Sequence, residues 1–206
     1  MPTDQLYIFE GTPAPSNISE QNVTGPNGAN NIPTTQYSYH FSQQEPMVIP
    51  GVGSLKIVDP TVFPASADMS AALVTIEPGA MRELHWHLQS DEWNFFISGT
   101  ARITVFSPPS SSRTFDYGPG DVGYIPMTFA HYIENTGTEP VVLLEMLKAP
   151  KFTDISASQW LGLTPRQVVK DTLNLPDSVL DNLPKYKPYI VPGSTNHTQT
   201  NFTRPF

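Results

Sequence analysis

The sequence of 206 residues predicts an all-β fold, an antiparallel barrel or jelly roll with an extended N-terminal arm and a short C-terminal helical tail. Two observations support this fold class. Short apolar or alternating runs recur through the middle of the chain, and turn signals such as Pro50-Gly51 and Pro78-Gly79 separate them at spacings typical of a sandwich or small barrel. The 22 prolines also favour many short segments over a helical bundle.

The elements follow one another in a simple order. Residues 1–35 are rich in Pro, Asn, Gly, Ser and Thr, so we expect an irregular arm there, and residues 36–150 should carry the barrel. In residues 151–192 the pair Thr164-Pro165 is typical of an N-cap followed by proline at the first helical position, which predicts a helical tail. Residues 193–206 are polar and should be coil. The expected strands are the runs 37–41, 54–58, 72–76, 93–97, 101–106, 114–117, 122–125, 131–134 and 141–147.

The composition excludes several functional classes. With 11 Lys and Arg against 19 Asp and Glu the formal net charge is −8, which disfavours nucleic acid as a partner but leaves a small anion possible beside a bound cation. The chain has no cysteine, so disulfides, thiolate ligands and a cysteine nucleophile are excluded. No apolar run approaches the roughly 20 residues needed to span a bilayer, so we expect no membrane association.

Glycosylation signals suggest a compartment. Four Asn-x-Ser/Thr sequons begin at Asn17, Asn22, Asn196 and Asn201, and all of them lie in the two polar ends of the chain. This distribution predicts a secreted glycoprotein. The first residues lack the basic start and apolar stretch of a signal peptide, so a secreted form is expected to have lost its leader.

Four residues predict a metal site. His85 and His87 are two residues apart, which places both imidazoles on one face of a strand, and a polar turn lets the carboxylate of Glu92 return to them. His131 must come from a distant strand, and taken alone it is more typical of a hydrogen-bonded core or surface residue. Together the four predict one divalent ion with about two open positions, which suits Mn, Fe, Co or Ni better than a closed zinc site. The spacing does not select among these metals.

The same residues carry a family resemblance. The pattern Gly79-x5-His85-x-His87-x4-Glu92-x6-Gly99 is similar to the first motif of the cupin family at every fixed position. A second cupin-like motif runs from Gly120 through Pro126 and His131 to Asn135. One departure is Thr128, where the family pattern favours glycine, so we expect the turn before His131 to be built differently.

Within the cupins, the segments 77–87, 91–99 and 120–126 closely resemble oxalate decarboxylases of the fungal bicupin type. The chain resembles the second barrel of those two-barrel proteins, with residues 1–35 resembling the linker between barrels. The resemblance implies a manganese-dependent decarboxylase that converts oxalate to formate and CO2 with O2 as co-catalyst. Two alternatives remain open, an oxalate oxidase that yields CO2 and hydrogen peroxide and a non-catalytic, metal-stabilised assembly module.

Two further residues are candidates for catalysis. The resemblance implies that Arg82 holds oxalate beside the metal, a role for which a bidentate guanidinium is suited, although position alone fits a surface salt bridge equally well. Glu145 lies in the apolar run 141–147, where burial should raise its pKa and suit it to proton transfer. A buried pair with Arg82 is compatible with that role. The stretch 151–158 lacks the Ser-Glu-Asn lid of the family's first barrel, so Asp154 is assigned no catalytic role.

Apolar side chains in the arm and tail predict association with another barrel. Leu6 and Ile8 in the arm, and Val179 and Leu180 in the tail, are expected to be exposed and to pair with a second copy. Cupins commonly associate through such elements, so the chain is expected to form a homo-oligomer.

Overall fold

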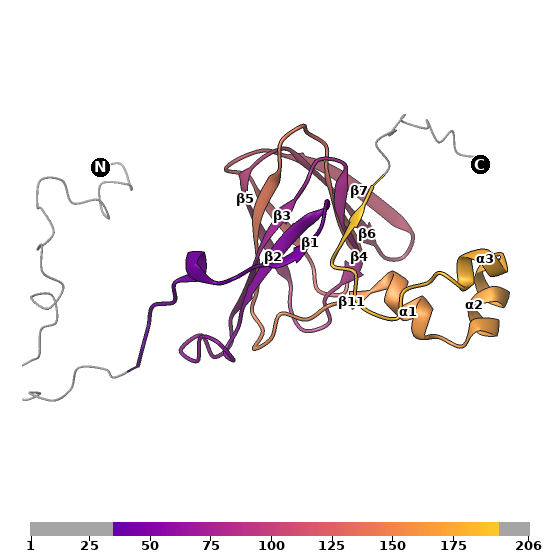
Figure 1. The fold of residues 1–206 in the computed structure, drawn as a ribbon, viewed down its shortest axis with the longest axis horizontal. Helices are drawn as coiled ribbons and strands as arrows, with labels where there is room; N and C mark the ends of the chain where they lie inside the picture. The colour runs from indigo at the N-terminus through magenta and orange to yellow at the C-terminus, as the bar shows by residue number, and fades with distance from the viewer. Residues whose placement is uncertain (1–34, 194–206) are drawn as a thin grey trace, which may run out of the picture. The chain divides into compact units, whose positions relative to one another are not determined.

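The computed structural model describes residues 35–193 (Figure 1). Contacts divide the chain after Ser38, and the barrel belongs to the unit that begins at Tyr39. Its strands are β1 (Met47–Ile49), β2 (Gly53–Val58), β3 (Ser70–Ile76), β4 (Ala80–Trp86), β5 (Glu92–Ser98), β6 (Ala101–Ser107), β7 (Ser111–Tyr117), β8 (Val122–Ile125), β9 (His131–Asn135), β10 (Val141–Leu147), β11 (Ile155–Ser156) and β12 (Ile190–Pro192).

The strands form two antiparallel sheets. One sheet has the order β1-β2-β3-β10-β5-β8, and the other has the order β11-β4-β9-β6-β7, with β12 also paired to β4. Alternate residues of β3 and β10 are buried, as expected for strands with one face toward a core. Burying each large apolar side chain stabilises the fold by about 1.5–3 kcal/mol. The fully buried core side chains include Val74, Ile76, Phe96, Ile103, Ile133 and Leu143.

The structure confirms the predicted all-β jelly roll and shows one predicted strand to be wrong. The run 37–41 forms no strand: residues 37–40 have no regular structure, and a 3-10 helix η3 (Phe41–Gln43) begins at the last residue of the run. Side-chain hydrogen bonds, rather than backbone pairing, attach the segment around η3 to β2. Gln44 Nε2 donates to the carbonyl oxygen of Ile57 at 2.9 Å, and Lys56 Nζ donates to the carbonyl oxygen of Ser42 at 2.9 Å. The edge strand β1 begins later, at Met47.

The tail after the barrel contains three short helices, which Figure 1 shows beside the barrel. They are α1 (Ala157–Leu163), α2 (Arg166–Leu173) and α3 (Asp177–Leu180). The helix expected at Thr164-Pro165 begins at Arg166, with Pro165 as its N-cap. Leu180 is buried, so its expected exposure is wrong, whereas Val179 is exposed. Leu6 and Ile8 lie outside the described residues.

The tail also adds two strands that the sequence did not predict. β11 pairs with the end of β4, and β12 pairs with its beginning, so that Ile190 lies opposite Arg82. The C-terminal segment thereby covers the edge of the strand that carries His85 and leads into His87. None of the helices within residues 35–193 is long and apolar enough to cross a membrane.

Candidate metal centre

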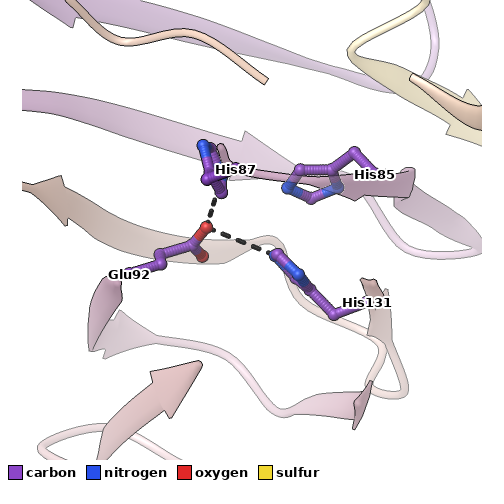
Figure 2. A group of neighbouring side chains, drawn as sticks. All are labelled: His85, His87, Glu92 and His131. Atoms are coloured by element: carbon purple, nitrogen blue, oxygen red, sulfur yellow. Dashed lines mark ion pairs between the residues drawn. The ribbon is translucent and has the colours of Figure 1, made fainter. Parts of the chain in front are cut away.

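Four buried side chains converge inside the barrel, as Figure 2 shows. His85 lies near the end of β4 and His87 just beyond it, while Glu92 begins β5 and His131 begins β9. The pairing of β4 with β9 places His85 directly opposite His131. The ligand atoms of the four residues lie within 4.8 Å of one another. The structure thus brings together the complete set that the sequence spacing indicated.

The hydrogen bonds of the three histidines prepare them to bind a metal. Each Nδ1 atom contacts a backbone carbonyl oxygen, at 2.6 Å for His85, 2.8 Å for His87 and 3.0 Å for His131. Because a carbonyl oxygen can only accept, Nδ1 must carry the proton in each ring, and Nε2 of a neutral ring then presents a lone pair. Among the described residues, none of the three Nε2 atoms has a hydrogen-bond partner.

The carboxylate of Glu92 completes a site that requires a cation. Its Oε2 atom lies 2.6 Å from Nε2 of His87 and 3.2 Å from Nε2 of His131, and no proton lies between these lone pairs in the neutral tautomers. A divalent ion would replace this repulsion with four bonds. Asn94 Nδ2 donates to Oε1 of Glu92 at 2.8 Å and fixes the carboxylate in place. Three imidazole nitrogens and one carboxylate oxygen fit Mn, Fe, Co or Ni.

The electrostatics of the cluster favour the protonation states that bind metal. Burial, with help from Arg82 and His131, lowers the pKa of His85 well below its usual value, so this ring is neutral. Burial alone would raise the pKa of Glu92, but a proton held between its carboxylate and His131 or His87 keeps that pKa well below its ordinary range, and a divalent ion in place of the proton would act in the same direction. The site therefore offers a neutral imidazole and an ionised carboxylate, the ligand forms that a divalent ion requires.

A β-bulge in β4 brings Arg82 to the same interior as His85. Residues three apart in a regular strand point to opposite faces. Here Arg82 pairs with Ile133 and His85 pairs with His131, so three residues of β4 match two of β9. Both side chains are fully buried as a result. Arg82 is therefore not the surface salt bridge that its position alone also allowed.

Glu145 lies beside Arg82 in the middle of a sheet. It belongs to β10, between β3 and β5, and its Oε1 atom lies 3.5 Å from Nε of Arg82. Its side chain is 0% exposed, and neither carboxylate oxygen has a hydrogen-bond partner among the described residues. Burial raises the pKa of Glu145, Arg82 opposes this rise, and Glu92 adds to it. The group can therefore hold a proton in the interior near the metal ligands.

The structure adds a buried charge cluster that the sequence interpretation missed. Nη2 of Arg82 contacts Oδ2 of Asp154, and Nζ of Lys187 contacts the other oxygen, Oδ1. Lys187 also lies 3.6 Å from Oε1 of Glu83, whose Oε2 atom accepts a hydrogen bond of 2.5 Å from Oγ of Ser156. Lys187 follows Arg82 by about a hundred residues, so no local spacing could have indicated their contact.

Burial also affects the lysine of this cluster. Desolvation and the neighbouring Arg82 lower the pKa of Lys187 to about 7, although Glu83 opposes them. Lys187 is therefore charged in mildly acidic solution, where it neutralises the carboxylate of Asp154.

The turn before His131 holds its threonine in a backbone conformation that is typical of glycine. Thr128 has a φ of 70°, in the left-handed region that β-branched residues rarely adopt. Its backbone N–H donates to the carbonyl oxygen of His87 at 2.8 Å, which joins the turn to a metal ligand. Thr128 thus adopts a conformation that favours glycine, which places backbone strain beside the metal site.

Together, this fold and site define a jelly-roll barrel that binds a single metal ion. The cupin family model matches residues 39–179, and the chain belongs to the cupin family. It is 44% identical to the oxalate decarboxylase of Bacillus subtilis over 93% of this chain and 48% of that protein. It is also 44% identical to an oxalate decarboxylase of Arthroderma benhamiae over 85% of this chain and 42% of that protein. The chain thus spans about half the length of these relatives.

Solved structures agree with the sequence comparisons. A structure of the Bacillus subtilis oxalate decarboxylase at pH 4.6 matches with a TM-score of 0.79 and 42% identity, over 87% of this chain and 46% of that one. Another structure of that enzyme, from a study of its Mn(II) centres, also matches with a TM-score of 0.79, over 87% of this chain and 47% of that one. The metal of that relative belongs to the group that the donor set here fits.

Proposed function

We propose that this chain is a manganese-dependent oxalate decarboxylase domain that converts oxalate to formate and CO2, with O2 as a required co-catalyst. The observation that supports it most is the grouping of Arg82 and the buried Glu145 beside the four metal ligands. A metal site alone needs no guanidinium and no proton-holding carboxyl next to it. Decarboxylation of a small dicarboxylate needs both, one for binding and one for proton transfer.

Each group has a defined task in this reaction. Bound manganese would supply a Lewis acid for a substrate carboxylate and one-electron chemistry. Arg82 would bind the substrate through charge-assisted hydrogen bonds, which are strong in a buried site. Glu145 would donate the proton that becomes the C–H hydrogen of formate, because burial keeps it protonated above the ordinary range of a glutamate. The barrel wall around these groups excludes water.

Proton supply separates the two candidate reactions. Decarboxylation of the oxalate dianion consumes one proton and gives formate and one CO2. Oxidation consumes O2 and two protons and gives two CO2 and hydrogen peroxide. A protonated Glu145 beside the substrate favours the first outcome because it delivers hydrogen to carbon before oxidation can occur. Oxalate oxidase activity is therefore the alternative that a failed proton transfer would produce.

The test is a product analysis of the manganese-loaded protein with oxalate in air. We expect formate and CO2 in equal amounts with little hydrogen peroxide. Glu145→Gln should reduce formate formation by about 100-fold, the usual contribution of a positioned general acid. The matched control is Glu139→Gln, which changes an exposed carboxylate and should leave the products unchanged. Stoichiometric peroxide from the unaltered protein would assign the oxidase activity instead, and full metal binding without turnover would assign the assembly role.

We also propose that the barrel pairs with a second copy through its helical tail. Large apolar side chains are exposed along these helices, and an exposed apolar patch is typical of an interaction surface. Sedimentation should show a dimer or larger species that Leu163→Ser with Val168→Ser dissociates. The control is Val48→Ser on β1, an equally exposed position outside the tail. A monomeric unaltered protein would contradict the pairing. The exposed tail residues are Trp160, Leu163, Val168, Leu173 and Val179.

Secretion and glycosylation are proposed from the sequence. The sequons at Asn17, Asn22, Asn196 and Asn201 lie outside the described residues, so their support is compositional. Expression through a eukaryotic secretory pathway should give a protein whose mass falls on enzymatic removal of N-glycans. An unchanged mass would contradict the glycoprotein assignment.

A further inference from the structure

Each of the three nitrogens of the Arg82 guanidinium faces a protein oxygen, and two of them donate a hydrogen bond. Nε faces Oε1 of Glu145 at 3.5 Å, Nη1 donates to the carbonyl oxygen of Tyr189 at 3.2 Å, and Nη2 donates to Oδ2 of Asp154. The side chain is 1% exposed. Both edges of the guanidinium that offer two parallel N–H groups include Nη2, so a bidentate substrate carboxylate competes with the group bound at that nitrogen.

The three partners differ in how firmly the fold holds them. The carbonyl of Tyr189 directly precedes β12, whose first residue pairs with Arg82 itself. Glu145 is fixed in β10, which has neighbouring strands on both sides. Asp154 belongs to the irregular segment between β10 and β11, and it presents a carboxylate to Nη2, the nitrogen that a bidentate carboxylate would use. Asp154 is the partner that a substrate can displace.

The backbone around Asp154 cannot move far. The carbonyl oxygen of the preceding residue, Thr153, accepts the hydrogen bond from Nδ1 of His87 at 2.8 Å, and the ring of Phe152 packs against that histidine. Movement of this segment would disturb a metal ligand. Displacement must therefore occur by rotation of the Asp154 side chain.

A second cation makes this rotation possible. The Asp154 side chain is 1% exposed, and an ionised carboxylate at such a site needs a partner of opposite charge. Lys187 contacts the oxygen that does not face Arg82, so it stays bound when the contact with Arg82 breaks. Lys187 is itself held near Glu83 and over the ring of Tyr189. The carboxylate thus has a cation at hand after it leaves the guanidinium.

We infer that Asp154 is an internal competitor for Arg82, and that Lys187 retains the Asp154 carboxylate when a dicarboxylate substrate displaces it. The inference rests on the proposed use of Arg82 as the anchor of a substrate carboxylate. Asp154 and Lys187 are positioning residues that set which anions displace the internal pair. A dicarboxylate contacts both the metal and Arg82, and the binding free energy of the two contacts together is sufficient to displace Asp154. A monocarboxylate at the metal leaves the pair of Arg82 and Asp154 intact.

Two substitutions should have opposite effects on oxalate binding. Asp154→Asn removes the charge of the competitor and should lower the Kd of oxalate about tenfold, as expected for the loss of one charge-assisted hydrogen bond. Lys187→Met leaves Asp154 dependent on Arg82 and should raise that Kd by about the same factor. A purely structural role would weaken binding in both variants. Asp116→Asn, which removes one charge from an exposed ion pair on β7, is the control and should change nothing.

The measurement is calorimetric titration of the manganese-loaded protein with oxalate under anaerobic, mildly acidic conditions, where turnover stops and Lys187 is charged. Acetate is titrated in parallel, because removing one buried charge alters the affinity of every anion to some extent. We expect the Kd of oxalate to shift relative to that of acetate. Equal shifts for both anions would overturn the inference, as would weaker oxalate binding by Asp154→Asn.

Turnover assays separate this inference from the proposed function. In air, the KM for oxalate should follow the anaerobic Kd while kcat changes little. If the unaltered protein binds oxalate without forming formate, the function fails, but the opposite shifts in Kd still support the competitor. If Asp154→Asn fails to fold, Lys187→Met alone provides the test. Its Kd for oxalate should rise relative to its Kd for acetate, and an unchanged ratio of the two would refute the inference.

Discussion

Replacing Thr128 by glycine should stabilise the protein, because the turn before His131 holds threonine in a left-handed conformation. The φ of 70° costs an L-residue about 1–2 kcal/mol. Glycine removes this cost, but it loses more conformational entropy on folding than threonine does. This entropy loss destabilises the folded protein by about 0.5–1 kcal/mol. Thr128 is exposed, so little packing is lost, and its hydrogen bond to His87 uses backbone atoms and persists. The free energy of unfolding should therefore increase by about 0.5–1 kcal/mol.

Urea unfolding of the metal-free protein measures this gain without a contribution from metal binding. Thr128→Gly should raise the midpoint at unchanged slope, and the melting temperature should rise by about 1–4 °C for a domain of this size. The matched control is Gly51→Ala, at a turn with a φ of 77° where no described atom lies within 4 Å of the added Cβ. The free energy of unfolding of the Gly51→Ala variant should fall by about 1 kcal/mol through backbone strain alone. An unchanged or lower midpoint for Thr128→Gly would refute the assignment of strain to this turn.

Three further predictions concern the site. Arg82→Lys keeps the charge but loses the forked geometry, so the KM for oxalate should rise at least about tenfold while the bound metal, measured by elemental analysis, stays constant. Asn94→Ala removes the hydrogen bond to Glu92 and should weaken manganese binding in a competition titration by about 10–100-fold. The pKa of Glu145 is raised in the folded state, so the folded protein binds its proton more tightly than the unfolded chain does. The stability of the metal-free protein should therefore be greatest below the unfolded pKa and decline as pH rises through the folded pKa, and Glu145→Gln should remove this decline.

The sequence predicted most of the barrel strands, and it grouped His85, His87 and Glu92, because these features depend on short-range periodicity. His131 comes from a distant strand and was identified through the second cupin-like motif. Alternation fixes which side chains of a strand face the core, and turn signals fix where each strand ends. The helix α1 was missed although a signal was present. Ser156 and Gln159 have the spacing of a capping box, and the structure shows Oγ of Ser156 accepting from the backbone N–H of Gln159 at 3.2 Å.

Two other features could not be predicted by the same reasoning. The bulge between Arg82 and His85 breaks the two-residue period, so alternation alone would place these side chains on opposite faces. The contact of Lys187 with Asp154 depends on how the C-terminal segment returns to β4, a tertiary arrangement without a local signal. Lys187 and its contact with Asp154 were therefore less visible in the sequence than the metal ligands.

The buried charges weigh against a barrel with a purely structural role. A metal-stabilised scaffold needs the three histidines and Glu92, whose donor atoms bind the ion. Arg82, Asp154 and Glu145 add ionisable groups to an interior where desolvation costs several kcal/mol for each ion. Replacing such a network with apolar side chains of similar volume is often neutral or stabilising, so stability does not explain its presence. The proposed binding of a small dicarboxylate would explain it, because the same guanidinium that holds Asp154 in the free protein would hold the substrate beside the metal.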